Sequence, residues 1–214
     1  MRIALASLKG GVGKTTLAVF LAEIAAERDG KALLVDADPQ QSAVQWDQEA
    51  REEGESLRAS VQPLPTRDLA RRLDALADSY RFVVVDTPPG DLAIVTAATR
   101  VADLVVIPCQ PTVMDVARVG EMIELAKRTN TPAVVVLSRA RARTRSRSDA
   151  RQALAAGFPL LDAEVPQREL LTTAYGGRPP LAALALFEPV FDELQAHAPP
   201  GGRRHAPSGG RRRG

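Results

Sequence analysis

The stretch LKGGVGKTT, residues 8–16, follows a short apolar run and precedes an alanine-rich one, so it is expected to join a buried strand to a helix. It matches the phosphate-loop pattern G-x-x-x-x-G-K-[ST], except that Leu8 stands where the pattern begins with glycine. Glycines let backbone N–H groups turn inward around an anion, and the N-terminus of the following helix adds positive potential. The loop therefore predicts a phosphate site. The alternative is a glycine-rich turn that holds no ligand.

The residue types in this phosphate loop (residues 8–16) indicate how it would hold a nucleoside triphosphate. Lys14 is expected to reach the β and γ phosphates and to act there in catalysis, and the Thr15 hydroxyl is expected to bind Mg²⁺. Backbone groups would supply the other phosphate contacts, which we assign to Gly10, Gly11, Val12, Gly13 and Thr16.

The rest of the chain alternates short β-rich runs with longer helical patterns. Most of the apolar runs lack alternation, as expected for strands that helices cover on both faces. This order predicts an α/β fold, a doubly wound and mostly parallel sheet flanked by helices, in a single domain over residues 1–197. Strands are expected at residues 3–8, 32–36, 82–86, 104–107 and 133–137, with weaker ones near 57–61 and 158–161, and helices near 15–28, 40–53, 67–78, 92–100, 114–128, 147–156, 168–174 and 180–196.

Two of these strands end in acidic groups. LLVDADPQ, residues 33–40, ends with Asp36 and Asp38, and FVVVDTPP, residues 82–89, carries Asp86. Ligands of doubly wound sheets bind at the carboxyl ends of strands, where Mg²⁺ would give buried carboxylates a partner. We expect Asp86 on the metal side through water, Asp36 in the same outer shell, and Asp38 as the group that orients the attacking water. The alternative for each aspartate is that it caps a helix.

The composition limits the classes of protein. Hydrophobic residues make up 45% of the 214 residues, and the single cysteine, Cys109, excludes an internal disulfide framework and paired-cysteine metal sites. No apolar run approaches the ~20 residues of a membrane span, and Lys9 interrupts the N-terminal run too early for a signal peptide. A cytoplasmic protein is expected. Trp46 is expected to pack in the core.

The C-terminal segment differs in composition from the rest. Residues 198–214 contain five arginines and no acidic residue, whereas the formal net charge of the whole chain is only +2. A segment rich in Gly, Pro and Arg cannot bury a core, so it is expected to be a disordered basic tail. It either adds nonspecific DNA affinity or acts as a solubilising terminus. Because it has no apolar face, no membrane anchoring is expected from it.

KGGVGKTT, VDADPQ, VVVDTPP and DLVVIPCQPTVMD together resemble the deviant-Walker ATPases of the ParA family, in particular its small, ParF-like plasmid-partition members. The similarity runs from residue 2 to about residue 194. It implies a P-loop NTPase fold, ATP and Mg²⁺ as cofactors, and a homodimer that sandwiches two nucleotides. Lys9 would be the family's signature lysine, which touches the phosphates of the opposite subunit, whereas Lys14 serves its own nucleotide. In a twofold dimer each Lys9 would complete the partner's site.

The resemblance also implies a function. The ATP-bound dimer would bind DNA nonspecifically on the nucleoid and hydrolyse ATP slowly, helped by a centromere-binding adaptor of the ParB or ParG kind, so that plasmids or chromosomes segregate. Two alternatives stay open. One is a ParA-like ATPase that positions another cellular cargo. The other is a metabolic P-loop ligase or kinase resembling dethiobiotin synthetase, which would not need Lys9 at a dimer seam.

An arginine-rich segment follows the last strong strand. SRARARTRSRSDAR, residues 138–151, alternates arginines with small residues. Arginines in such a segment would meet DNA phosphates and make binding sensitive to salt, or they would pair with nearby acids in a solvated loop. The arginines that we assign to DNA here are Arg141, Arg143, Arg145 and Arg147.

The resemblance also suggests a base pocket. In similar proteins the end of this strand lies beside the adenine, which places Arg139 there. EVPQREL, residues 164–170, resembles the other side of the same pocket. We expect Pro166 and Gln167 nearest the base and Arg168 on the DNA side.

Overall fold

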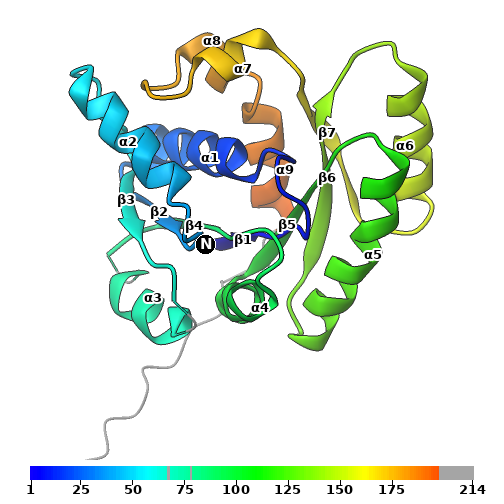
Figure 1. Cartoon of the computed structure of the whole chain (residues 1–214), viewed down its shortest axis with the longest axis horizontal. Helices are drawn as coiled ribbons and strands as arrows, with labels where there is room; N and C mark the ends of the chain where they lie inside the picture. The colour runs from blue at the N-terminus through cyan, green and yellow to red at the C-terminus, as the bar shows by residue number, and fades with distance from the viewer. Residues whose placement is uncertain (67, 78, 198–214) are drawn as a thin grey trace, which may run out of the picture.

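In the described residues, seven parallel strands form one sheet with helices on both faces (Figure 1). The computed structural model describes residues 1–66, 68–77 and 79–197, so the expected tail at 198–214 and the expected helix start at residue 67 lie outside the described residues. The strands are β1 (Arg2–Leu5), β2 (Ala32–Asp36), β3 (Ser60–Pro63), β4 (Phe82–Asp86), β5 (Leu104–Cys109), β6 (Ala133–Ala140) and β7 (Leu160–Pro166). The helices are α1 (Lys14–Asp29), α2 (Ser42–Glu52), α3 (Leu69–Ala77), α4 (Leu92–Val101), α5 (Val113–Arg128), α6 (Arg145–Ala155), α7 (Glu169–Thr173), α8 (Leu181–Leu184) and α9 (Glu188–His197).

The strand order places the first strand in the middle of the sheet. The order is β3-β2-β4-β1-β5-β6-β7, so the chain winds to one side of β1 and then to the other, which creates the switch point where ligands bind. Asp36 at the end of β2 lies beside Asp86 at the end of β4, and Asp86 lies beside Leu5 at the end of β1. The register therefore brings both aspartates to the place where the chain enters the phosphate loop.

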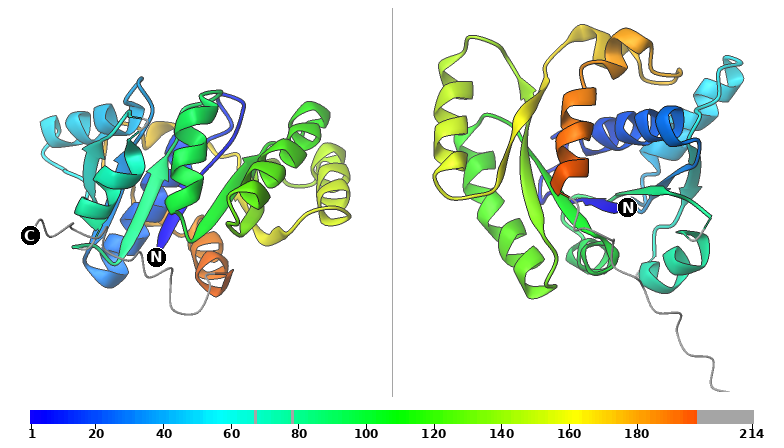
Figure 2. Two further views of the ribbon diagram at one scale, coloured as in Figure 1. Left: turned by 90° about the horizontal axis from the view of Figure 1, so that it is seen from below. Right: turned by 180° about the vertical axis from the view of Figure 1, so that it is seen from behind.

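The inner strands bury both of their faces, which explains the continuous apolar runs. Ile3 and Leu5 pack on one face with α1, α8 and α9, while Ala4 packs on the other with α3 and α4. Along the same second face, α5 and α6 cover Val105 and Ile107 of β5. The two further views in Figure 2 show helices on both sides of the sheet. The loops at the carboxyl ends of the strands are left as the surface that a ligand can reach.

The C-terminal helix differs from expectation. The sequence predicts one helix over 180–196, but the structure has two, α8 and α9. Pro189 lies in the first turn of α9, where its missing N–H is tolerated, whereas in one continuous helix its ring would clash with the carbonyl of Ala185. Between the helices, Phe187 turns into the core and stacks on Phe20, with ring centroids 4.2 Å apart. The break between α8 and α9 therefore accommodates Pro189 and lets Phe187 pack in the core.

Other differences concern the ends of elements. β1 ends at Leu5 instead of residue 8, and α6 begins at Arg145 instead of residue 147. β7 extends to Pro166, so this strand reaches the segment that we assign to the base pocket. Within the described ranges no helix has both the length and the apolar character that a membrane span requires.

Candidate nucleotide-binding site

Two glycines shape the loop between β1 and α1. Gly11 has a φ of 75° and Gly13 a φ of 93°, conformations that other residues rarely adopt. Gly13 is the N-cap of α1, and it offers no side chain to cap the first N–H groups of that helix. Those N–H groups and the partial positive charge of the helix N-terminus therefore face the loop. This is the arrangement that binds phosphate at helix N-termini.

Two buried charged side chains lie at the phosphate loop, Lys14 and Asp86, and Thr15 bonds to the second of them. Lys14 is only 6% exposed, and its Nζ donates to the carbonyl of Lys9 over 3.2 Å. The Thr15 hydroxyl donates to Asp86 Oδ2 over 2.7 Å. Burial lowers the pKa of Lys14 from its ordinary value and raises the pKa of Asp86 to about 7. The chain by itself therefore compensates neither charge fully.

One oxygen of Asp86 is left over. Its Oδ1 is buried and has no hydrogen-bond partner among the residues that the structure describes. A buried carboxylate oxygen beside the Thr15 hydroxyl suits the outer shell of a hydrated Mg²⁺, which takes one or two protein oxygens and otherwise water and phosphate. No cluster of three or more His, Cys, Asp or Glu side chains occurs in the described parts of the chain, so a metal here would depend on the phosphates of a ligand.

Asp36 holds the start of α2. Its Oδ2 accepts the N–H groups of Ala43 and Val44 over 2.9 and 3.1 Å, and its Oδ1 accepts that of Asp38 over 3.1 Å. Burial raises the pKa of Asp36, while these N–H groups oppose the rise. The structure thus gives Asp36 the helix-capping role that the sequence left as the alternative. An outer-shell role toward the metal stays a prediction, for which Oδ1 has the remaining acceptor capacity.

Asp38 lies on the open side of the same region. With Lys14 and the glycines of the phosphate loop, it lines a cavity of about 320 Å³. Its Oδ1 accepts the backbone N–H of Gln40 over 2.9 Å, which fixes the carboxylate. The negative charge of Asp38 also helps to raise the pKa of Lys14 against the effect of burial. Asp38 therefore lines the same cavity as the phosphate loop, and its role in orienting the attacking water stays a prediction.

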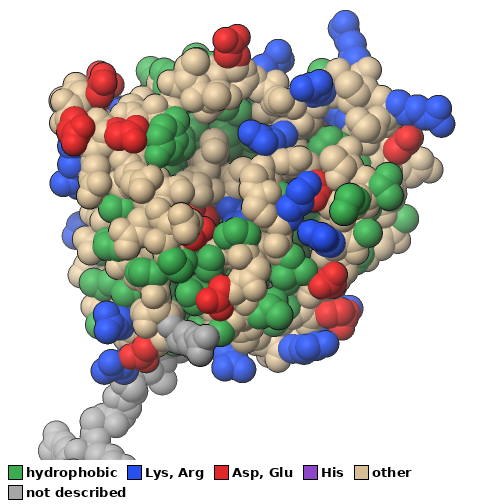
Figure 3. Space-filling model, in the orientation of Figure 1, with side chains coloured by type: hydrophobic (Ala, Val, Ile, Leu, Met, Phe, Trp, Pro, Cys, Tyr) green, Lys and Arg blue, Asp and Glu red, His purple; other side chains and the backbone are tan. Residues whose placement is uncertain are grey.

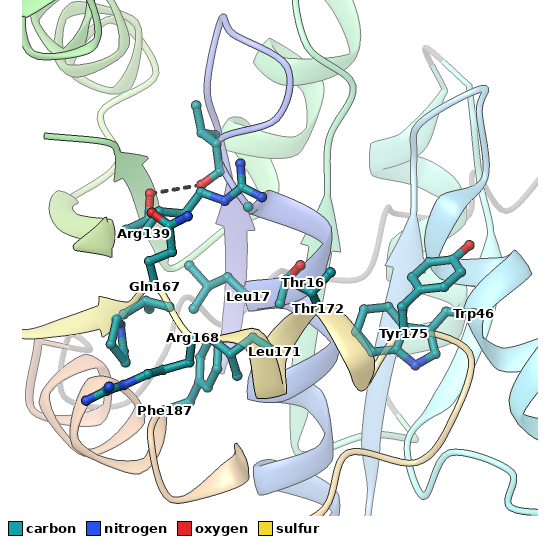
Figure 4. Close-up of a pocket in the computed structure, with 15 residues that line it drawn as sticks. Thr16, Leu17, Trp46, Arg139, Gln167, Arg168, Leu171, Thr172, Tyr175 and Phe187 are labelled. Atoms are coloured by element: carbon teal, nitrogen blue, oxygen red, sulfur yellow. Dashed lines mark hydrogen bonds between the residues drawn. The ribbon is translucent and has the colours of Figure 1, made fainter. Parts of the chain in front are cut away.

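A second cavity, of about 300 Å³, adjoins the first (Figure 4). Its apolar walls come from Leu17, Leu171 and Phe187, and it is also lined by Pro166, Gln167 and Arg168, so Arg168 lies beside the expected base pocket. Apolar walls with a few polar groups suit a planar base. The residues that line both cavities, and so mark the passage between them, are Gly13, Thr16, Trp46, Arg139 and Tyr175.

Arg139 is held in a strained position at this passage. Its φ is 52°, in the left-handed region that arginine rarely occupies. Its Nη1 donates to the carbonyl of Gly11 over 3.1 Å, and Gln110 Nε2 donates to the same carbonyl over 2.8 Å. Backbone strain that is retained in this way is typical of functional sites. The structure therefore places Arg139 beside the phosphate loop as well as beside the expected base pocket.

Trp46 and Tyr175 are cavity residues that the sequence did not reveal. Trp46 is 1% exposed, in agreement with a core position, but it lines both cavities. Its Nε1 donates to the carbonyl of Gly177 over 2.8 Å, and its ring centroid lies 5.0 Å from that of Tyr175. Figure 4 shows the two rings side by side, next to Thr16. An aromatic residue on a helix looks alike in sequence whether it faces the core or a cavity, so no local signal marked Trp46.

Lys9 points away from the phosphate cavity. Its Nζ lies 3.1 Å from Asp115 Oδ2 and 3.0 Å from Asp115 Oδ1, while its side chain is 41% exposed. Asp115 belongs to the first turn of α5. The two lysines of the loop are therefore separated in the structure: Lys14 is buried under the cavity, and Lys9 is paired at the surface.

Some arginines of the arginine-rich segment pair with acidic side chains elsewhere in the chain. Figure 3 shows Lys and Arg side chains gathered on the upper right of the molecule, the side of β6 and α6 in Figure 1. Arg147 Nε lies 2.6 Å from Glu164 Oε2, which favours the alternative of pairing with acids, and a contact of Arg147 with DNA stays a prediction. Arg141 donates to Gln167 over 3.0 Å. The exposed Arg143 and Arg168 make no ion pair with any described residue, and the 93% exposed Arg145 makes only a long contact of 3.5 Å with Asp149.

Comparisons with known proteins agree with this site. A family model described as "CobQ/CobB/MinD/ParA nucleotide binding domain" matches residues 3–180. The "Maintenance of carboxysome distribution protein A" of Gloeobacter kilaueensis is 36% identical over 180 residues, which cover 81% of this chain and 76% of that protein. The chromosome-partitioning ATPase Soj of Thermus thermophilus is 36% identical over 135 residues, which cover 51% of this chain and 54% of Soj.

A solved structure shows the same fold. The ATP complex of a McdA variant from Cyanothece gives a TM-score of 0.74 at 19% identity, with 91% of this chain and 96% of that chain covered. The two chains therefore share a fold. Because the family model spans most of the sequence, this chain belongs to the CobQ/CobB/MinD/ParA nucleotide-binding family, and within it to the ParA type.

Proposed function

We propose that this protein is a Mg²⁺-dependent ATPase that positions a cargo over DNA: it dimerises around two ATP molecules, binds DNA nonspecifically in that state, and leaves DNA after hydrolysis. The observation that carries this proposal is the pair of residues Lys14 and Thr15, which line a cavity of about 320 Å³ that adjoins one of about 300 Å³, with Asp86 bonded to Thr15. A nucleoside triphosphate is the ligand that fills both cavities at once.

The relatives suggest two kinds of cargo. The Gloeobacter relative, which matches over most of its length, maintains carboxysome distribution, so a protein-bound cellular body is the first candidate. The match to Soj favours a second candidate, a chromosome or plasmid held through a ParB-like or ParG-like adaptor. Both candidates require the same cycle of ATP binding and hydrolysis on nucleoid DNA.

The site residues divide the work of hydrolysis. Lys14 would balance charge on the β and γ phosphates. Mg²⁺, held by Thr15 and through water by Asp86, would neutralise further charge on the same oxygens. Asp38 would accept a hydrogen bond from the attacking water and hold it in line with the bond that breaks. Catalysis then consists of positioning and charge compensation without a covalent intermediate, which is consistent with slow turnover.

The edge around Lys9 has the features of a dimer surface. Two facing triphosphates carry more negative charge than Lys14 and one Mg²⁺ per site can balance, so a second cation is needed. Around the phosphate loop, the first residues of α4 and α5 expose large apolar side chains: Leu92 is 54%, Val113 88% and Met114 66% exposed. Exposed apolar side chains near a charged site favour a protein contact. An isologous dimer would bury them and bring each Lys9 toward the partner's phosphates.

Arg143, Arg145 and Arg168 are the arginines best placed for DNA. They lie near the ends of β6 and β7. Among the described residues, Arg145 makes one long ion pair, and Arg143 and Arg168 make none. Each arginine that meets a phosphate contributes about −0.9 to the dependence of log K on log salt. A dimer doubles the number of such contacts, which links DNA binding to ATP.

Sedimentation with a nonhydrolysable ATP analogue tests the proposal. The wild type is expected to sediment as a dimer, whereas Lys9→Ala should bind the analogue and remain monomeric. Lys127→Ala is the matched control, because Lys127 is an exposed lysine that pairs with Glu124 on its own helix. A Lys9→Ala protein that dimerises and hydrolyses ATP as the wild type does would favour a metabolic P-loop enzyme instead. The Asp38→Ala protein, locked with ATP, should then retrieve the cargo adaptor from a lysate.

A further inference from the structure

The contacts of Lys9 in the single subunit raise a question about its role. If Lys9 serves the opposite subunit, its ammonium group must be free to leave its own. In the structure it is not free: its Nζ lies within 3.1 Å of both carboxylate oxygens of Asp115. This contact joins two segments that are 106 residues apart in the sequence.

Asp115 is itself held in place. Its side chain is only 3% exposed, although the lysine that it pairs with is half open to solvent. The Thr112 hydroxyl donates to Asp115 Oδ2 over 2.7 Å, and the Asp115 N–H donates back to the Thr112 oxygen over 3.2 Å. The Asp115 carboxylate is therefore fixed in one position as an acceptor, whereas the flexible Lys9 side chain is the partner that can move.

The same segment holds the phosphate loop at a second point. Gln110 donates to the carbonyl of Gly11 over 2.8 Å, two residues beyond Lys9. Residues 110–115 thus contact the loop both at its backbone and at its signature lysine. Val113 and Met114, the exposed apolar residues of the expected dimer edge, lie between these two contacts. Residues 110–115 therefore take part both in covering the expected dimer edge and in releasing Lys9.

We propose that Asp115 is a positioning residue that holds Lys9 inside its own subunit and so opposes dimerisation until ATP is bound. The inference rests on the proposed function, because it assumes that Lys9 crosses to the partner. Each dimer that forms must break two Lys9–Asp115 pairs, one per subunit. After hydrolysis the pairs re-form within each chain, which favours separation. Asp115 thereby sets the threshold of ATP and protein concentration at which the dimer appears.

The size of the effect follows from the two pairs. A partly exposed ion pair of this kind shifts an equilibrium by up to roughly fivefold. Because two such pairs break for each dimer, removing the carboxylate should tighten the dimer by up to roughly 25-fold. A role of Asp115 restricted to the stability of α5 predicts no such gain, because it affects monomer and dimer alike.

The test compares Asp115→Asn with the wild type by sedimentation in saturating nonhydrolysable ATP analogue. Asparagine keeps the size and the acceptor for Thr112 but loses the charge. We expect the dimer dissociation constant to fall, by up to roughly 25-fold. Glu121→Gln is the matched control: it removes one charge from an exposed position of the same helix and should leave the constant unchanged.

A second measurement does not depend on the dimer. In the nucleotide-free protein, a double-mutant cycle of Lys9→Ala and Asp115→Asn on urea unfolding should give a coupling of up to roughly fivefold in the unfolding constant. An Asp115→Asn protein that dimerises with the affinity of the wild type, or more weakly, overturns the inference and leaves the proposed function intact. If neither protein dimerises at any concentration, the proposed function fails and the inference fails with it.

Discussion

The phosphate loop with its aspartates (the loop edge) and the arginine-rich segment after β6 (the arginine edge) are two stretches of the same carboxyl edge of the sheet, and their charges are compensated in opposite ways. At the loop, Lys14 and Asp86 are buried, and Asp86 Oδ1 has no partner within the described chain. At the arginine edge Arg143 and Arg145 are exposed, while the half-buried Arg147 and Arg151 both pair with Glu164. A buried charge without full compensation indicates that a ligand binds beside it. A charge nearer the surface that is paired within the chain indicates a solvated surface. Breaking each edge should therefore have different consequences.

The largest expected effect comes from Lys14. Lys14→Ala should lower the rate of ATP hydrolysis by about 10³-fold or more, because it removes the buried cation at the point where charge develops on the phosphates. Phosphate release under saturating ATP measures it. Lys127→Ala, which removes an exposed lysine, serves as the control and should keep the rate. A Lys14→Ala rate within tenfold of the wild type would show that the buried cation is structural.

Asp86 gives the next effect, and it depends on pH. In the nucleotide-free protein, burial raises the pKa of Asp86 to about 7, above the ordinary value of 3.8. Between pH 4 and pH 7 the folded state therefore binds more protons than the unfolded chain, so this group's contribution to stability is lost as the pH rises. Asp86→Asn removes that loss. It should match the wild type near pH 4 and be more stable at pH 8, by at most roughly 4 kcal/mol.

Urea unfolding at both pH values, without nucleotide or Mg²⁺, measures this difference. Glu55→Gln, which changes an exposed carboxylate, should show no such dependence on pH. Equal stabilities of Asp86→Asn and wild type at pH 8 would mean that the buried carboxylate is compensated by the chain, and the contrast between the two edges would lose its basis.

The sequence predicted the loop edge better than the arginine edge, for a physical reason. Buried parallel strands leave continuous apolar runs, and the residues that follow them meet at one edge, so Asp86 and Lys14 could be placed from local patterns. The contacts of Lys9 and Arg147 depend on distant partners. Asp115 lies on another helix, and Glu164 comes from β7, whose register with β6 contains irregularities that no alternation in sequence would indicate.

A smaller effect is expected at the arginine edge. Replacing Arg143, Arg145 and Arg168 together by alanine should weaken ATP-dependent binding to random-sequence duplex DNA by about 10- to 100-fold and reduce the salt slope by roughly 3 per subunit. Fluorescence anisotropy in the presence of the ATP analogue, at several salt concentrations, measures both. Arg72→Ala and Arg81→Ala, on other surfaces of the fold, are the charge controls. Unchanged binding in the triple variant would place the DNA surface elsewhere.

The smallest effect is expected from Glu164. It tests the contrast most directly, because removing this acid takes away internal charge compensation from the arginine edge. Glu164 receives Arg147 at 2.6 Å and Arg151 at 2.9 Å, so it withdraws two cations from the surface. Glu164→Gln should release Arg147, while Arg151 keeps its pair with Asp162, and should raise DNA affinity about threefold, with a steeper salt dependence. The same change should lower the free energy of unfolding by only about 1 kcal/mol, since both pairs with Glu164 are partly exposed. If DNA affinity does not rise, Arg147 points away from the duplex even when free, and its pair with Glu164 serves only to join α6 to β7.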